Sequence, residues 1–173
     1  MGNLTVDASH ARIAAEVFAS GFKVLFDFAS TGYNQATIVS TLLNAHYPAG
    51  ATATATALKQ VVRKFLVPIS PDTGVSTGWR LGAVPTVVIV ITDGDSTESG
   101  SDVLFWADQI RAVGANILAI GVGNLVNTTQ LEEIAGTPSQ VILVNNESAL
   151  ESIIQQFIQQ FPCQGPLKGL HWR

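Results

Sequence analysis

The second half of the chain alternates between two kinds of hydrophobic pattern. Unbroken apolar runs, typical of strands buried on both faces, alternate with apolar positions three and four residues apart, typical of amphipathic helices. The pattern predicts strands at 86–92, 116–123 and 140–145 and helices at 102–114, 128–136 and 148–161. This alternation predicts a mostly parallel sheet with helices on both faces, which is a doubly wound (Rossmann-like) α/β fold.

The first half of the chain is expected to begin with strands and to continue with helices. Residues 11–19 and 23–29 read as two strands joined by a short break, in the manner of a hairpin. Helices are predicted at 34–45 and 54–66. The first of these helices carries an apolar stripe that we expect to be buried, formed by Ile38, Val39, Leu42 and Leu43.

Three elements support more detailed expectations. The strand at 86–92 does not alternate with polar residues, so we expect it to be central in the sheet. The helix at 148–161 repeats apolar residues at helical spacing, and we expect its Ile153/Phe157 face to pack on the sheet. Thr129 and Ser148 are each followed three residues later by a glutamate, which predicts a capping box at the start of each helix.

Composition and charge narrow the class of protein. The chain has 173 residues, enough for one domain with a sizeable core, and its 47% apolar and 13% charged residues exclude a disordered chain. A net charge of −4 without a Lys/Arg cluster argues against a nucleic-acid surface. The apolar run at 84–91 is too short to span a bilayer, and no signal-peptide pattern is visible. Glycosylation sequons at Asn3, Asn127 and Asn146 favour a secreted parent protein.

Asp93 directly follows the strand at 86–92, and ligands of doubly wound folds bind beyond the carboxyl ends of the strands. Because Asp-Gly is common turn chemistry, Asp93 is either a turn or N-cap residue or a metal ligand. Mg²⁺ prefers about six oxygen ligands, so one carboxylate would need hydroxyls from neighbouring loops. Such hydroxyls, or else caps of the helix at 54–66, are offered by Thr52, Thr54 and Thr56.

Several segments, in order along the chain, resemble a von Willebrand factor type A domain. They are "KVLFDFA", "GATATATALK", "VVIVITDG", "ILAIGVGN" and "QLEEIAG". Each segment alone is weak evidence for this family, whereas the combination of segments in this order is specific to it. The resemblance covers about Val6 to Cys163 and implies the α/β fold described above.

In that family, the loops at this edge of the sheet build a metal-ion-dependent adhesion site. Carried over by motif, the resemblance implies that Thr52 is a metal ligand and that Asp93 reaches the metal, Mg²⁺, through water. It further implies a non-enzymatic adhesion or matrix-interaction module in an extracellular protein, whose protein partners complete the metal coordination with an acidic side chain. The nearby Asp95 and Glu98 are interpreted as solvated loop residues; the alternative is that they add negative charge to the metal site.

The chain departs from the family at its amino end. The family's first strand ends in Asp-x-Ser-x-Ser and lies in the middle of the sheet, and neither this strand nor the helix after it is found here. Asp7-x-Ser9 lacks the third position and is interpreted as a linker. We therefore expect a type A domain at 1–163 without its N-terminal portion, a tail at 164–173, and a Mg²⁺ site that is weak or absent. The resemblance also implies that Cys163 pairs with a cysteine upstream of Met1; a free thiol is the alternative.

Glu16 stands in the middle of the strand at 11–19, where the family usually has an apolar residue. A buried carboxylate without a partner is costly. Since the neighbouring strand is expected to be missing, we expect Glu16 to face water.

Two other functions stay open. The sequence "GVGN" at 121–124 is the nearest to a Gly-rich phosphate loop, but it lacks the third glycine, so a cofactor- or nucleotide-binding enzyme is the weaker alternative. His10, His46 and His171 lie far apart, and no Gly-x-Ser-x-Gly motif is present. The third function is a metal-independent interaction surface.

Overall fold

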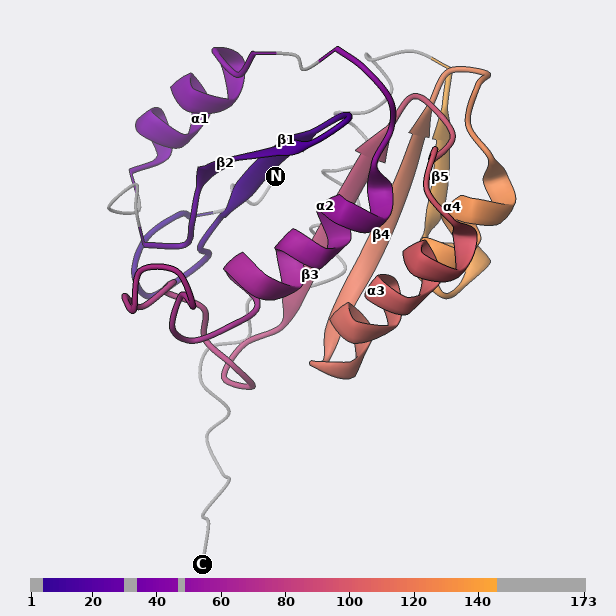
Figure 1. Ribbon diagram of the computed structural model, residues 1–173. Helices are drawn as coiled ribbons and strands as arrows, with labels where there is room; N and C mark the ends of the chain where they lie inside the picture. The colour runs from indigo at the N-terminus through magenta and orange to yellow at the C-terminus, as the bar shows by residue number, and fades with distance from the viewer. Residues whose placement is uncertain (1–4, 30–33, 47–48, 146–173) are drawn as a thin grey trace, which may run out of the picture.

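The computed structural model describes residues 5–29, 34–46 and 49–145, and Figure 1 shows their arrangement. A parallel three-stranded sheet has the order β3-β4-β5 and is formed by β3 (Thr86–Thr92), β4 (Ala115–Val122) and β5 (Val141–Val144). A separate antiparallel hairpin consists of β1 (Ala15–Phe18) and β2 (Phe22–Phe26). The predicted α/β fold with a parallel sheet and flanking helices is therefore confirmed.

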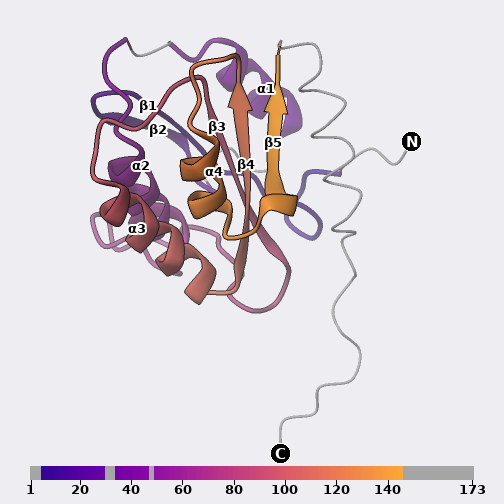
Figure 2. The same cartoon turned by 90° about the vertical axis from the view of Figure 1, so that its right-hand side faces the viewer.

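Helices cover one face of the parallel sheet, as Figure 2 shows. They are α2 (Thr54–Gln60), which continues into the π-helical turn η1 (Val61–Phe65), α3 (Gly100–Ala112) and α4 (Thr128–Ala135); a short 3₁₀ turn, η2 (Pro138–Gln140), precedes β5. The core between helices and sheet includes Leu58, Ile110, Ile117 and Ile134, which are at most 2% exposed. No helix in the described ranges is long and apolar enough to cross a membrane.

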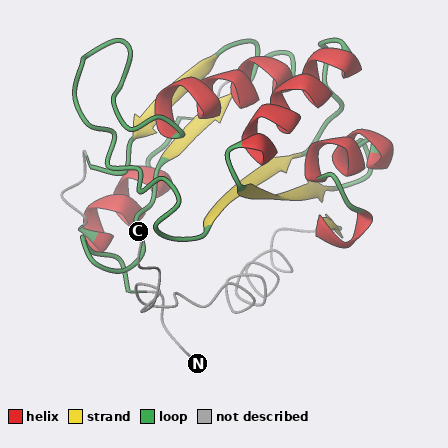
Figure 3. Ribbon diagram, turned by 90° about the horizontal axis from the view of Figure 1, so that it is seen from below, coloured by secondary structure: helices red, strands yellow, loops and turns green. Residues whose placement is uncertain are grey.

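The prediction that the strand at 86–92 is central was wrong. β4 is the central strand of the parallel sheet, and β3 lies at its edge, with Ile89 38% and Ile91 42% exposed. The hairpin lies beyond β3 as a sheet of its own (Figure 3), so no strand among the described residues pairs with the outer edge of β3. An apolar run indicates that both faces of a strand are hydrophobic. It does not indicate how many strands pair with the edges of that strand.

The second face of the parallel sheet is also apolar. It presents a cluster of buried side chains from β4 and β5, which are Leu118, Ile120 and Val144. The helix expected at 148–161, its Ile153/Phe157 face and the capping role of Ser148 fall outside the described residues, as do Cys163 and the tail. Those expectations therefore stay predictions.

Glu16 does not face water as expected. It lies in β1 opposite Val24, just after an irregularity in the hairpin register, and its side chain is largely withdrawn from solvent. Its Oε2 is fully buried and has no hydrogen-bond partner among the described residues. Burial raises the pKa of Glu16 to about 8, because the charged form loses hydration without gaining a partner.

The apolar stripe predicted for the first helix is only partly buried. α1 (Gln35–Leu43) begins at Asn34, whose side chain accepts a hydrogen bond from the Thr37 amide at 3.0 Å. Ile38 is 3% exposed, whereas Leu43 is 80% exposed and both Val39 and Leu42 are exposed. The periodicity predicted the helix correctly, but no element among the described residues covers most of its apolar stripe.

The caps of α4 differ from the predicted capping box. The helix begins after Asn127, whose side-chain oxygen accepts a hydrogen bond from the Gln130 amide at 3.2 Å, so Asn127 rather than Thr129 is the N-cap. Asparagine is among the strongest N-cap residues, which explains why the earlier residue takes this position. At the other end, Gly136 adopts the left-handed conformation with φ of 84° and lies against the Arg111 side chain.

Gly136→Ala is expected to lower the free energy of unfolding by about 1–2 kcal/mol, because a side chain in the left-handed region clashes with its own backbone. The added Cβ would also lie 3.1 Å from atoms of Arg111. Gly21→Ala is the matched control, since a Cβ there meets nothing within 4 Å; it should cause no loss of stability. Urea denaturation measures both, and equal losses would contradict the backbone explanation.

Candidate binding site at the carboxyl edge of the sheet

The Asp93 loop (residues 93–99) connects β3 to α3 and packs against the segment that precedes α2. The Thr97 amide donates a hydrogen bond to the Thr52 carbonyl at 3.0 Å, and the Ser96 hydroxyl donates to the same oxygen at 3.2 Å. A Cβ on Gly94 would lie 3.4 Å from the Thr52 hydroxyl oxygen. The structure therefore places the Thr52 side chain against Gly94, the residue that follows Asp93.

The segment that carries Thr52 is itself fixed by the end of β1. The Ala53 amide donates to the Ala19 carbonyl at 2.8 Å, and the Ala51 amide donates to the Ser20 hydroxyl at 2.9 Å. The hairpin thus anchors both neighbours of Thr52. Residues 31 and 44 positions apart in the sequence are thus brought to one edge of the molecule.

Asp93 is exposed, and no hydrogen bond joins its carboxylate to another described residue. The turn that follows it is closed by Thr92, whose hydroxyl donates to the Gly94 carbonyl at 3.1 Å. The N-cap of α3 is Ser99, so the interpretation of Asp93 as a helix N-cap was wrong. Its carboxylate is free to meet a ligand from solvent, while its role as a metal ligand stays a prediction.

Glu98 is not a solvated loop residue as interpreted from the sequence. Its Oε2 accepts a hydrogen bond from the Thr56 amide at 2.9 Å, and its Oε1 accepts one from the Thr56 hydroxyl at 2.6 Å. The N-cap residue of α2, Ala53, makes no side-chain hydrogen bond, so Glu98 satisfies a first-turn amide of α2 from another loop. No local signal identifies this role, because the two residues are distant in sequence.

The three threonines before and within α2 have different environments. Thr54 is 1% exposed and lies in the interior, and the Thr56 hydroxyl is held by Glu98. Neither is the N-cap of α2. Of the three hydroxyls offered by the sequence, that of Thr52 is the one that lies beside the turn after Asp93.

The Asp93 loop also contacts the start of α4. The Ser96 amide donates to the Gln130 side-chain oxygen at 3.0 Å, and the Asn127 amide group donates to the Asp95 carboxylate at 3.3 Å. Asp95 is exposed and thus remains partly solvated, in keeping with its interpretation. The loop is held between the first turns of α2 and α4.

Asp7 and Ser9 belong to a different edge of the molecule. The Asp7 carboxylate accepts hydrogen bonds from the amide and imidazole of His10 and from the Ser9 amide, which hold its pKa below the usual range. The following Arg12 donates to the Gly78 carbonyl at 2.6 Å. The loop around Gly78 leads into the amino end of β3, opposite to Asp93, so the linker interpretation of Asp7-x-Ser9 agrees with the structure.

At this edge the described residues offer few side-chain oxygen donors for Mg²⁺. Within the described ranges, no group of three or more His, Cys, Asp and Glu side chains could hold a metal ion. Thr52 and Asp93 would supply one hydroxyl and one carboxylate, against the roughly six oxygens that Mg²⁺ prefers. The residues present therefore fit only part of such a site.

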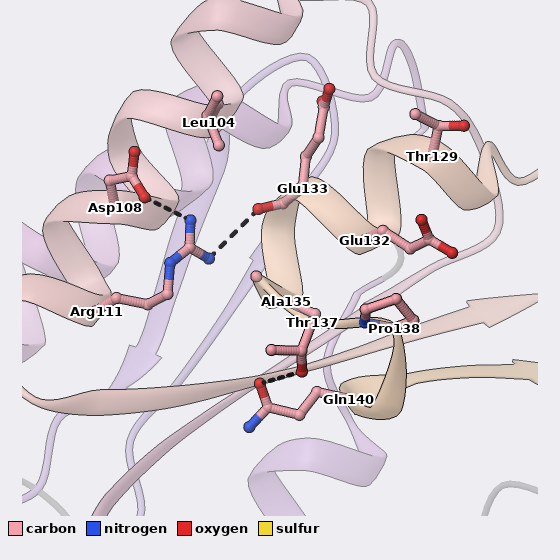
Figure 4. A pocket seen from close by; sticks show the side chains of 11 residues that line it. Leu104, Asp108, Arg111, Thr129, Glu132, Glu133, Ala135, Thr137, Pro138 and Gln140 are labelled. Carbon is pink, nitrogen blue, oxygen red and sulfur yellow. Dashed lines mark hydrogen bonds and ion pairs between the residues drawn. The ribbon is translucent and has the colours of Figure 1, made fainter.

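A groove of about 530 Å³ between α3 and α4 offers no comparable chemistry (Figure 4). Its one cationic side chain, Arg111, donates to the Ile134 carbonyl at 2.5 Å and to the Asp108 carboxylate at 2.7 Å. Arg111 thus satisfies carbonyl groups at the carboxyl end of α4 and is paired with Asp108. The carboxyl edge of the sheet is the stronger candidate site.

Comparison with known proteins agrees with this architecture. The model of the von Willebrand factor type A domain matches residues 1–156. Cuticlin-6 of Caenorhabditis elegans is 33% identical over 150 residues, covering 86% of this chain and 23% of that protein. The mouse collagen alpha-4(VI) chain is 33% identical over 111 residues, or 64% of this chain and 4% of the collagen chain. This chain thus spans less than a quarter of either relative.

Among solved structures, this chain superposes with a TM-score of 0.72 on proximal thread matrix protein 1 from the mussel byssus. That structure has a zinc-occupied metal-ion-dependent adhesion site (MIDAS) motif. The identity is 21%, and the match covers 90% of this chain and 36% of that chain, so this likeness concerns the fold. The family match over residues 1–156 is decisive: the chain belongs to the von Willebrand factor type A domain family.

Proposed function

We propose that the chain is a non-enzymatic protein-interaction module of an extracellular, matrix-type protein, spanning residues 1–163 and followed by a tail at 164–173. It contacts protein partners through the carboxyl edge of its parallel sheet. The observation that carries this proposal is the Asp93 loop, which presents an exposed carboxylate next to the Thr52 segment and is held by two helix starts. The kinship with a cuticlin, a collagen VI chain and a byssal matrix protein supports it.

We propose that the chain by itself binds a metal ion only weakly at this edge of the sheet. A zinc-occupied MIDAS motif in proximal thread matrix protein 1 supports a cation near this edge in the present chain. Here Thr52 and Asp93 are the donors, and an acidic side chain of a partner would add a further carboxylate. Because Thr52 is neutral and Asp93 has a single charge, the chain alone would hold Mg²⁺ poorly.

Isothermal titration with Mg²⁺ is expected to give a dissociation constant in the millimolar range at best. Asp93→Ala should abolish whatever heat of binding is seen, whereas Asp95→Ala, which removes a carboxylate from the same loop, should preserve most of it. Micromolar Mg²⁺ binding that Asp93→Ala abolishes would contradict the weak site, because it would require a complete set of ligands.

Partner recognition is tested with a short peptide that contains one glutamate, against the same peptide with glutamine. Amide chemical shifts of the labelled protein should move at Thr52 and in the Asp93 loop with the glutamate peptide and Mg²⁺. Shifts of equal size in EDTA would favour the metal-independent surface instead. Shifts located away from this edge would overturn the proposal.

A further inference from the structure

We propose that Glu98 is a positioning residue, which clamps the Asp93 loop onto α2 and thereby sets the position of Asp93 relative to the Thr52 segment. The inference rests on the proposed function, because it concerns the same edge of the sheet. It assigns to Glu98 a task that is distinct from ligand binding. Three features of the structure support it.

The first feature is the geometry of the clamp. Both carboxylate oxygens of Glu98 bind one residue, Thr56, through its amide at 2.9 Å and its hydroxyl at 2.6 Å. Hydrogen bonds to an ionised acceptor are stronger than neutral ones. Glu98 and Thr56 are also partly buried, so these bonds are less exposed to competition from water.

The second feature is the continuity of contacts along the loop. The Glu98 amide donates to the Ser96 hydroxyl at 3.2 Å, and Ser96 and Thr97 both donate to the Thr52 carbonyl. Three consecutive loop residues thus hold two positions of the Thr52–Thr56 segment. The clamp therefore fixes the register of the loop against that segment.

The third feature is that Asp93 has no anchor of its own among the described residues. Its carboxylate makes no hydrogen bond there, so its location depends on how the rest of the loop is held. If Glu98 left Thr56 to bind a cation, a first-turn amide of α2 that is partly withdrawn from water would lose its acceptor, which is costly. This cost argues that Glu98 holds the loop and does not serve as a ligand.

The test measures hydrogen exchange of the Thr97 amide in metal-free protein, a readout that does not depend on any ligand. In Glu98→Ala this amide should exchange about tenfold faster or more, as expected from losing charged hydrogen bonds. Glu98→Gln keeps one acceptor oxygen and should restore part of the protection. Thr56→Val keeps the Thr56 amide and should also cause a partial effect, while the control Glu132→Ala, on the exposed surface of α4, should cause none.

Mg²⁺ titration of the same variants separates a clamp from a ligand. If Glu98 acts as a clamp, Mg²⁺ binding should weaken in the same order as the Thr97 amide loses protection from exchange. Glu98→Gln should then lie between the wild type and Glu98→Ala. The proposal would be overturned if the Thr97 amide exchanged at the wild-type rate in all variants. It would also be overturned if both Glu98 variants lost Mg²⁺ binding equally while this amide exchanged normally. If the wild type binds neither Mg²⁺ nor the acidic peptide, the proposed function fails, yet the exchange data still decide the role of Glu98. If Glu98→Ala does not fold, the same measurements on Glu98→Gln and Thr56→Val test the proposal.

Discussion

Leu58→Ala is expected to lower the free energy of unfolding by about 2–5 kcal/mol, because it leaves a cavity in the middle of the core. Leu58 is 2% exposed and belongs to the cluster that joins α2 to α3, α4 and the parallel sheet. The same cluster contains Val90 of β3, Ile110 of α3 and Ile134 of α4. The substitution should therefore weaken the whole domain and also loosen the contact between α2 and the Asp93 loop.

Leu43→Ala is the matched control for this experiment. Leu43 is also a helical leucine, but it is 80% exposed, so its truncation should change stability by less than about 0.5 kcal/mol. Urea denaturation followed by circular dichroism gives both values. A loss below about 1 kcal/mol for Leu58→Ala would contradict the packing of α2 on the sheet.

Glu16 is expected to make the domain less stable as the pH rises. The pKa of its carboxyl is about 8 in the folded protein, against a reference value of 4.5, because burial disfavours the charged form. Between these two values the folded protein keeps a proton that the unfolded chain has lost. The contribution of Glu16 to the free energy of unfolding is thus fully present below pH 4.5, and it is lost as the pH rises toward 8.

The size of the effect follows from the width of this window. Each pH unit within it changes the free energy of unfolding by at most about 1.4 kcal/mol. A difference of 8 − 4.5 = 3.5 units sets an upper bound of about 5 kcal/mol, and we expect a loss of a few kcal/mol.

Glu16→Gln isolates this contribution, because glutamine has nearly the same shape and does not titrate. The variant and the wild type should have similar stability near about pH 4.5, and the variant should be more stable by a few kcal/mol near about pH 8.5. Asp7, whose pKa is lowered, is present in both proteins and cancels in the difference. Glu132→Gln, at an exposed position, is the control. Parallel stability curves for wild type and Glu16→Gln would show that the carboxyl is not desolvated.

Much of the fold in the second half of the chain was predictable from local pattern. The helix predicted at 102–114 corresponds to α3, and its apolar residues Val103, Ala107 and Ile110, spaced three and four positions apart, are fully buried. A helix repeats its faces every three to four residues, so the sequence itself records which face meets the core. In the first half of the chain, the hairpin β1–β2 was also predictable, because its two strands and the break between them are adjacent in sequence.

The arrangement of the sheets was not predictable from these patterns. β3 has the sequence of a central strand and nevertheless lies at the edge of its sheet, with Ile89 and Ile91 partly exposed. Strand neighbours are chosen by segments far apart in the chain, and no local period encodes that choice. The same reason applies to α1, where the sequence predicted the helix but not which of its apolar residues find a partner.

At the candidate site, the order of residues along the chain was enough to select Asp93 and Thr52 as candidate ligands. Asp93 at a strand end and Thr52 before a helix follow from the order of elements, and the family resemblance gave them their expected roles. Three features became visible in the folded chain alone: Glu98 holds Thr56, Asp7 lies at the opposite edge, and Glu16 is withdrawn from water. The physical reason is that burial and hydrogen bonding depend on what surrounds a side chain, and these surroundings come from segments distant in sequence.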